Sequence, residues 1–496
     1  MRASGILLPI SSLWSNYGIG CFSKEAYEFV DFLVEAKQKY WQILPIGPTS
    51  YGDSPYQSFS TFAGNPYFID LESLVEEGKL KKTDCNKVDF GKNKEYVDYE
   101  KIYKARFKLL HKAYDNSDIV NDKEFEQFKK ENEYWLRDYA MFMAIKDVFG
   151  GKAFTEWAED IRLRWAYSME YYQTEYYFEI EFYEYVQYLF FKQWFKLKNY
   201  ANSKGIKIIG DIPIYVAADS ADVWAHPELF QMTEDRKPTG VAGCPPDGFS
   251  ATGQLWGNPL YNWDFHRATG YDWWVRRIAQ CRQMYDVIRI DHFRGFDQYY
   301  SIPAEDKDAT NGHWENGPGI DLFNVIRDKL GKVDIIAEDL GYITDSVKQL
   351  VKDSGFPNMK VLEFAFDSRD SSGPAEYLPH NYDKNCVVYT GTHDNETLMG
   401  WIDSINKEEI EQIKEYTGRR FETNEQIASE IIRMAMASTA DLCIIPIQDY
   451  LGLDNKARMN QPSTIGNNWR WRVKKSQIDK RLVSKISKYT TVYGRA

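Results

Sequence analysis

The sequence lacks the spacings that mark common metal and redox sites. Its six cysteines are dispersed with no Cys-x-x-Cys pair, which argues against a zinc knuckle, a dithiol centre or a disulfide framework. It has no His-Glu-x-x-His motif and no Walker lysine, and Gly18-Ile-Gly20 lacks the third glycine of a dinucleotide loop. The acidic run from Asp306 to Glu315 does not follow the EF-hand ligand order. These patterns give no support to a metal or nucleotide site.

Long apolar runs and an excess of basic residues are also missing. No segment reaches the roughly 18 apolar residues of a membrane span, and the apolar stretch Ile6–Ile10 is short and interrupted by Pro9. The net charge of −12 disfavours nucleic acid and anionic membranes as partners because like charges repel. Scattered thiols and the lack of a leader pattern predict a cytoplasmic protein that acts on a neutral substrate.

Aromatic residues are abundant, at 16% of the chain with 35 Tyr and 15 Trp. Their flat apolar faces can lie against sugar rings while their polar tips hydrogen-bond to hydroxyl groups. Large protein cores use aromatic residues too. The composition therefore favours a sugar ligand without deciding it.

Short apolar runs that end in polar residues, glycine or proline recur along the chain. Eight such runs, several separated by helical patterns, predict a (β/α)8 TIM barrel. The expected strands are Gly5–Pro9, Trp41–Pro45, Lys207–Asp211, Val287–Asp291, Asp334–Glu338, Lys360–Phe364, Cys386–Thr390 and Leu442–Ile447. Expected helices include Glu25–Ala36, Asp345–Ser354 and the apolar stripe from Phe182 to Ala201.

The unequal spacing of the strands predicts two insertions in one catalytic barrel spanning residues 1–496. Residues 51–171, approximately, form a largely helical insertion after strand 2, with helices expected at Tyr99–Asn116 and Asp122–Phe149. Residues 217–274, approximately, form an insertion after strand 3. Its segment Gly240–Gly257 has too many glycines and prolines for helix or strand, so we expect a mobile lid there. Insertions after barrel strands lie on the catalytic face.

Three carboxylates, Asp291, Glu338 and Asp394, each follow a strand-like run, in the segments Arg289–Gly295, Ile335–Gly341 and Gly391–Thr397. Because the C-terminal ends of parallel strands converge on one face, these acids are expected to lie together. Two carboxylates on either side of a bond are what glycosidic cleavage requires. Any one of them could instead cap a helix or end a solvated loop.

The neighbours of two of these acids suggest different protonation states. Alternate side chains of a strand share a face, so Arg289 is expected beside Asp291, where it would lower the pKa of that carboxyl. A structural ion pair would give the same pattern. Glu338 follows apolar residues that would raise its pKa, as a general acid requires, and Asp339 competes for that role.

With these residues in place, the sequence resembles glycoside hydrolase family 77, the 4-α-glucanotransferases also called amylomaltases or disproportionating enzymes. The resemblance covers nearly the whole chain and is specific when its motifs are taken together. These motifs are Tyr17-Gly-Ile-Gly20, Gly52-Asp-Ser-Pro-Tyr56, Gly210-Asp-Ile-Pro-Ile-Tyr215, Pro245-Pro-Asp247, Gly253-Gln-Leu-Trp-Gly-Asn-Pro259 and Asn468-Trp-Arg-Trp-Arg472.

The resemblance implies α-1,4-glucan transfer with retention, without metal or organic cofactor. It implies that Asp291 is the nucleophile, Glu338 the acid/base and Asp394 the transition-state stabiliser. It implies substrate contacts at Ser54, Tyr56, Asp211, Asp247, Trp256, Arg289, His393 and Asn460, and a secondary glucan site at Tyr51. The expected partners are maltooligosaccharides and α-1,4-glucans, with glucose as an acceptor and with neither nucleic acid nor membrane.

Two alternatives share these residues. An α-amylase-type hydrolase would use the same carboxylates with water as the acceptor, and a glucan-binding protein would keep them without turnover. Presence of all three acids and Arg289 argues against the binding protein. Retention requires the Asp291 and Glu338 carboxyls to stand roughly 5–5.5 Å apart, which is the spacing we expect.

Overall fold

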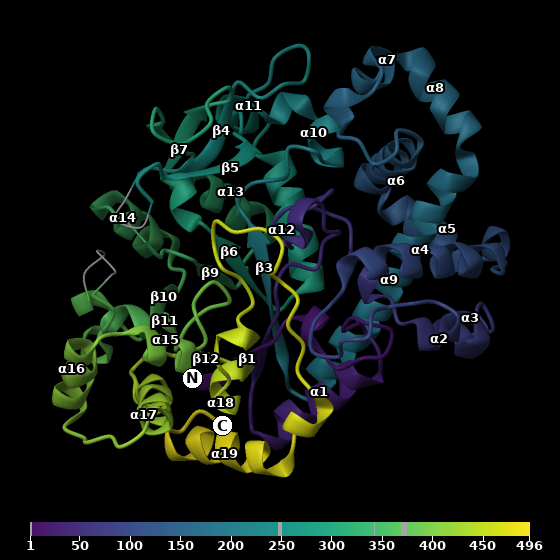
Figure 1. Cartoon of the computed structure of the whole chain (residues 1–496). Helices are drawn as coiled ribbons and strands as arrows, with labels where there is room; N and C mark the ends of the chain where they lie inside the picture. The colour runs from purple at the N-terminus through teal and green to yellow at the C-terminus, as the bar shows by residue number, and fades with distance from the viewer. Residues whose placement is uncertain (1, 247–249, 342, 369–373) are drawn as a thin grey trace.

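A closed parallel barrel forms the centre of the computed structural model, which describes residues 2–246, 250–341, 343–368 and 374–496. Within these residues, eight strands close in the order β1-β12-β11-β10-β9-β6-β3-β2, so neighbours in the chain are neighbours in the barrel (Figure 1). The (β/α)8 prediction is confirmed. The strands are β1 (Ala3–Leu7), β2 (Tyr40–Gln42), β3 (Lys207–Pro213), β6 (Val287–Asp291), β9 (Ile335–Ala337), β10 (Asn358–Val361), β11 (Cys386–Tyr389) and β12 (Leu442–Pro446).

The alternation of side chains along the strands divides the barrel interior into layers. A separate apolar cluster includes Ile209, Val287 and Ile336 from β3, β6 and β9, and all three are at least nine-tenths buried. The residues two positions further along these strands share the same face, and they are Asp211, Arg289 and Glu338. An apolar layer therefore lies beneath a charged layer at the C-terminal end of the barrel.

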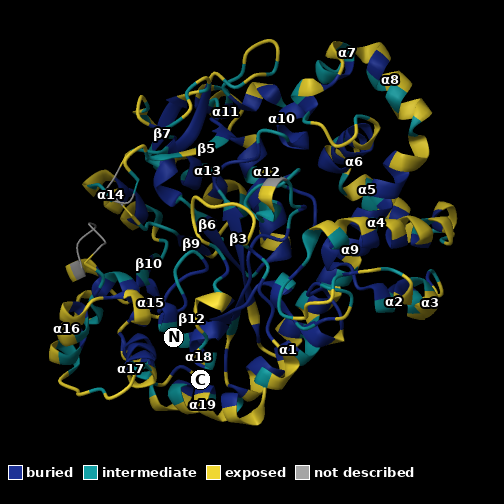
Figure 2. Cartoon of the chain, viewed as in Figure 1, coloured by how far each residue is buried: buried dark blue, intermediate teal, exposed yellow. Residues whose placement is uncertain are grey.

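Helices cover the outside of the barrel, and their outward faces carry the exposed residues while the strands are buried (Figure 2). The helices expected from periodicity form as α1 (Lys24–Glu35), α9 (Tyr177–Ser203) and α14 (Asp345–Ser354). Further helices outside the two insertions are α12 (Asp272–Met284), α13 (Ile320–Leu330), α15 (Leu398–Ser404), α16 (Lys407–Thr417), α17 (Asn424–Ala437), α18 (Ile447–Leu451) and α19 (Lys480–Val492). The chain ends meet at the base of the barrel, where Arg495 Nη1 donates to the Ala3 carbonyl over 3.0 Å.

The segment between β2 and β3 is largely helical and lies to one side of the barrel (Figure 1). One expected helix divides, because Asn132 has non-helical backbone angles and separates α5 from α6. The helices that precede α9 are α2 (Leu71–Glu76), α3 (Lys82–Asn86), α4 (Tyr99–Asp115), α5 (Lys123–Glu131), α6 (Glu133–Val148), α7 (Glu159–Arg162) and α8 (Ala166–Glu175). No helix in the described ranges is long and apolar enough to cross a membrane.

The segment after β3 carries α10 (Ala221–Ala225), α11 (Trp263–Ala268) and two strands, β4 (Gly240–Cys244) and β5 (Gln254–Pro259). These strands join β7 (Gln298–Pro303) and β8 (His313–Asn316) in an antiparallel sheet ordered β5-β4-β7-β8. Our expectation that Gly240–Gly257 forms no strand is therefore wrong at both of its ends. The glycines permit close pairing, since a Cβ atom on Gly243 would stand 2.1 Å from the Gln254 carbonyl oxygen.

Candidate active site

The charged layer begins with an ion-pair group across β3 and β6. The strand register places Asp211 directly opposite Arg289, and both side chains are buried. Arg289 Nη1 lies 2.7 Å from each carboxylate oxygen of Asp211 and 3.1 Å from Oδ1 of Asp291. One guanidinium therefore pairs with two carboxylates, and it lies closer to the fully buried Asp211 than to Asp291.

Glu338 follows β9 and is held by backbone donors. The N–H of His292 lies 2.6 Å from Oε2, and the N–H of Leu340 lies 2.8 Å from Oε1. His292 adopts the left-handed region, with φ of 54°, which is uncommon outside glycine and turns the chain immediately after β6. This local turn aims an N–H group from the Asp291 strand end at Glu338.

Asp339 is occupied elsewhere. Its carboxylate accepts a hydrogen bond from the Met359 backbone N–H over 3.0 Å and one from Asn358 Nδ2 over 3.1 Å. These contacts tie Asp339 to the start of β10. Asp339 therefore faces β10, whereas Glu338 lies beside the chain that follows Asp291.

Asp394 lies in the loop after β11, and 43% of its side chain is exposed. Asn460 Nδ2 donates to Oδ1 over 2.6 Å, and His393 Nε2 lies 3.3 Å from Oδ2. Arg458 donates to the backbone carbonyls of Asp394 and Asn460, over 2.7 Å in each case. The C-terminal segment therefore fixes this loop while the carboxylate keeps an open side.

Tyr56 connects the two halves of the site. Its hydroxyl donates to Oδ2 of Asp211 over 2.8 Å and lies 2.8 Å from Nε2 of His393. Because the single hydroxyl proton goes to Asp211, His393 must carry a proton on Nε2 to donate to Tyr56. The rings of Tyr56 and His393 stack with centroids 5.2 Å apart, and Trp469 packs against both. A continuous chain of contacts thus runs from Asp291 to Asp394.

Withdrawal from water dominates the electrostatics of the two central acids. Burial raises the pKa of Asp291 well above its ordinary value, and the nearby Glu338 adds to this, while Arg289 opposes it. Burial also raises the pKa of Glu338, against Arg289 and the two backbone N–H groups. The expected net lowering at Asp291 is wrong in direction, because burial outweighs the effect of Arg289, and the charges of Glu338 and Asp211 add to the rise. The acids titrate as a pair that retains a proton more readily than either would in water.

The two histidines beside these acids are held neutral. Burial lowers the pKa of His292 to about 3, and the cationic Arg294 adds to the effect. Burial also lowers the pKa of His393, although the neighbouring Asp394 opposes this. Both rings are therefore neutral at ordinary pH, and His393 hydrogen-bonds to Tyr56 in this form.

The remaining expected site residues are distributed unevenly. Trp256 lies in β5 with its ring 4.8 Å from His292, edge to face, which brings it to the Asp291 side of the site. Ser54 accepts a hydrogen bond from the Tyr56 backbone N–H over 3.3 Å and so orders the Tyr56 turn. Asp211 is fully buried, so its expected substrate contact is not available in this structure. Asp247 and the side chain of Tyr51 lie outside the described residues.

Comparison with known proteins establishes the family. A family model described as 4-alpha-glucanotransferase matches residues 8–478. The chain belongs to glycoside hydrolase family 77. A 4-alpha-glucanotransferase of Clostridium butyricum is 50% identical over 492 residues, which cover 98% of this chain and 100% of that protein.

Solved structures agree with this family 77 assignment. An amylomaltase from Streptococcus agalactiae, solved in complex with acarbose, gives a TM-score of 0.96 at 44% identity and covers 100% of both chains. An amylomaltase from Corynebacterium glutamicum has the same fold, with a TM-score of 0.80 at 17% identity over 99% of this chain and 75% of that one. The resemblance seen in the motifs is confirmed.

Two residues of this family 77 site carried no role in the sequence. Arg458 acts on the Asp394 loop from 64 positions away along the chain. Trp469 packs on Tyr56 and His393, and its φ of 65° is unusual for a bulky residue. Trp469 lies within the motif Asn468–Arg472, and that motif was the only signal that could have indicated it.

Proposed function

We propose that this chain is a 4-α-glucanotransferase that moves a segment of an α-1,4-glucan to the 4-OH of an acceptor by retaining double displacement. The family and the identity to named 4-alpha-glucanotransferases support the transferase activity and do not favour the hydrolase alternative. The observation that carries the residue assignment is the location of Asp291, Glu338 and Asp394 at the C-terminal ends of β6, β9 and β11. Arg289, Asp211, Tyr56 and His393 connect Asp291 to Asp394, and the His292 N–H connects the Asp291 strand end to Glu338.

In the first half of the reaction, Asp291 attacks C1 of the bound glucosyl unit as Glu338 protonates the departing glycosidic oxygen. The C1–O bond to the leaving glucan breaks and a C1–O bond to Asp291 forms. Burial raises the pKa of both acids, so the pair retains a proton for donation, and the mechanism places this proton on Glu338. Arg289, 3.1 Å from Asp291, favours the ionised carboxylate once the proton of the pair resides on Glu338.

In the second half, Glu338 is ionised and removes the proton of the acceptor 4-OH, which attacks C1 and releases Asp291. The two successive displacements at C1 restore the α configuration. Asp394 keeps an open side where sugar hydroxyls can bind, and Asn460 orients it from the opposite side. Trp256 and Tyr56 offer aromatic faces at this rim.

Glucans are the natural ligands of such a rim. The related amylomaltase was solved with acarbose, which supports binding of α-1,4-glucans and maltooligosaccharides here, with glucose as a further acceptor. Neither a metal nor an organic cofactor enters the proposed steps. We also propose a cytoplasmic location, because the six cysteines are free thiols and five of them are buried.

Incubation with maltotriose tests the proposal. Transfer should give glucose and a ladder of longer maltooligosaccharides with constant total reducing ends, and a chelator should leave the rate unchanged. Rising reducing ends with short products only would establish the hydrolase instead. Proton NMR of the first-formed products should show that the newly formed glycosidic linkages have the α configuration.

Replacement of Asp291 by Asn tests the residue assignment. The amide cannot attack C1, so turnover should fall at least 1,000-fold, on the order expected for loss of a covalent nucleophile, while circular dichroism stays unchanged. Asp339→Asn is the matched control, because that carboxylate faces β10. Substantial activity in the Asp291 variant would contradict its proposed role.

A further inference from the structure

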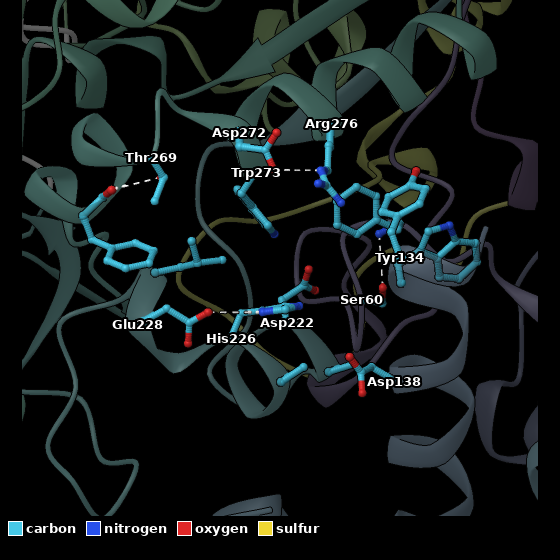
Figure 3. A pocket seen from close by; sticks show the side chains of 16 residues that line it. Ser60, Tyr134, Asp138, Asp222, His226, Glu228, Thr269, Asp272, Trp273 and Arg276 are labelled. Carbon is cyan, nitrogen blue, oxygen red and sulfur yellow. Dashed lines mark hydrogen bonds and ion pairs between the residues drawn. The ribbon is translucent and has the colours of Figure 1, made fainter. Parts of the chain in front are cut away.

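A second cavity lies outside the candidate active site, between the helical insertion and the insertion after β3. It has a volume of about 290 Å³ and is bordered by α6, α10, α11, α12 and the segment Ser60–Phe62 (Figure 3). None of the described residues assigned to the candidate active site lines it. Its volume is near the lower end of the roughly 300–1,000 Å³ typical of small-molecule sites.

Aromatic side chains form much of the wall. Phe62, Trp135 and Trp273 are buried, and Tyr134 is partly exposed at 38%. The Phe62 ring lies edge to face with both Tyr134 and Trp273, at centroid separations of 5.5 and 6.1 Å. Flat apolar walls of this kind suit the faces of a sugar ring.

One buried donor in this wall has no protein partner. The indole Nε1 of Trp273 has no hydrogen-bond partner among the residues that the structure describes, although the residue is only 8% exposed. In Figure 3 the Trp273 ring extends in among the lining side chains, with its nitrogen at the inner tip. This nitrogen has almost no surface open to water, so a ligand oxygen would reach it only after a lining side chain moved, and the hydrogen bond would then offset the cost of the unpaired N–H.

Most of the charged groups around the cavity have an ionic or hydrogen-bonding partner, and Asp222 accepts from a backbone N–H. Arg276 Nε lies 2.8 Å from Asp272, and His226 Nδ1 lies 3.2 Å from Glu228. Asp138, a further lining residue, lies 2.6 Å from Nη2 of Arg164. A charged ligand would have to compete with these pairs, whereas a neutral ligand with hydroxyl groups can hydrogen-bond to their free edges. The chemistry therefore favours a neutral polyol with an apolar face.

We propose that this cavity is a second carbohydrate site, which binds one or two neutral glucosyl units of an α-glucan away from the reacting bond. The choice of a glucosyl ligand rests on the proposed function, while the neutral aromatic cavity is independent of it. The segment Ser60–Phe62 borders this cavity and also borders a second hollow, which is lined by Tyr56 and Asp211 of the candidate active site.

This shared segment is fixed from the cavity side. Asp222 accepts a hydrogen bond from the Thr61 backbone N–H over 2.8 Å. Gln280 donates to the Phe62 carbonyl over 2.7 Å and accepts from the Tyr134 hydroxyl. A ligand in the cavity would therefore contact residues that hold the base of the Tyr56 loop.

The pair Thr269→Trp and Thr269→Ala tests the proposal. Thr269 is an exposed lining residue at the end of α11, so a large side chain there fills the cavity from its edge, whereas alanine leaves it open. Both changes are made in the Asp291→Asn background, where turnover is blocked. Equilibrium dialysis with radiolabelled maltose counts the molecules bound per chain.

We expect the Trp variant to bind one maltose fewer per chain than the Ala variant, which should match the Asp291→Asn parent. The indole N–H signal of Trp273, assigned with Trp273→Phe, should shift with maltose in the Ala variant. This readout decides the matter even where the Trp variant fails to fold. Equal stoichiometry in both folded variants, or an unmoved Trp273 signal, overturns the proposal.

Binding of tetramethylammonium in this cavity without maltose would overturn the sugar assignment, because it would identify an aromatic cation site. The result of this cavity test does not depend on whether the proposed transferase activity is correct. Wild-type protein that lacked transfer on maltotriose would contradict the transferase proposal, and the two Thr269 variants would still report whether the cavity holds a sugar.

Discussion

Asp211 offers a sharp test of how the charged layer operates, because it is fully buried and yet touches no reacting atom in the proposed mechanism. Its carboxylate accepts two contacts of 2.7 Å from Arg289 and one of 2.8 Å from Tyr56. Asp211→Asn keeps the shape and removes the charge. Hydrogen bonds to charged groups contribute about 1.5–3 kcal/mol each, and loss of a buried ion-pair partner costs about 3–5 kcal/mol.

The expected loss lies toward the lower of these figures. Asp291 stays 3.1 Å from Arg289, so the guanidinium is not left without an anion, and the new amide oxygen still accepts one hydrogen bond. We expect the free energy of unfolding to fall by about 2–3 kcal/mol in urea denaturation. Glu100→Gln is the control, since it breaks an exposed pair with Lys104 and should leave the urea midpoint nearly unchanged.

The same variant should change the pH profile of activity. Asp211 contributes to the raised pKa of Asp291, and its removal also leaves the charge of Arg289 undivided, so the pKa of Asp291 should fall. The acid limb of kcat/KM reports ionisation of the nucleophile in the free enzyme and should move to lower pH by roughly one unit. An unchanged profile together with unchanged stability would refute the view that Asp211 shares the charge of Arg289.

Three further changes test other parts of the structure. Asn460→Ala removes the 2.6 Å hydrogen bond to Asp394 and should lower kcat/KM about tenfold with normal circular dichroism; a change below twofold would contradict this. Burial lowers the pKa of His266 to about 4, so the unfolded state binds more protons between about pH 6.5 and 4 and stability falls as the pH falls. Denaturation across that pH range should show the free energy of unfolding of His266→Gln falling by about 3 kcal/mol less than that of wild type. An equal fall in both proteins would contradict this role of His266. Gly210→Ala places a Cβ atom 2.2 Å from the Tyr285 ring and should lower the thermal midpoint through a loss of about 2 kcal/mol or more; an unchanged midpoint would show that the ring can move.

The local pattern of the sequence was sufficient for the barrel. Each strand is a short apolar run that cannot continue as a helix, and the register of a closed parallel barrel brings their C-terminal ends together. Asp291 and Glu338 could therefore be placed on one rim from their positions after Val287–Ile290 and Ile335–Ala337. The local pattern did not predict the strands of the glycine-rich segment Gly240–Gly257. They form because β4 pairs with β7, which begins more than 40 residues later, and β5 pairs with β4.

Local sequence thus determined which residues reach the catalytic rim, because side-chain alternation and strand direction are properties of neighbouring residues. Only the tertiary structure decided how these residues divide their roles. The choice of Asp211 as the close partner of Arg289, the engagement of Asp339 by β10 and the connection of His393 to Tyr56 all join strands or loops far apart in the chain. The direction of the Asp291 pKa belongs to this second group, since it depends on burial and on every charge that packing brings within reach.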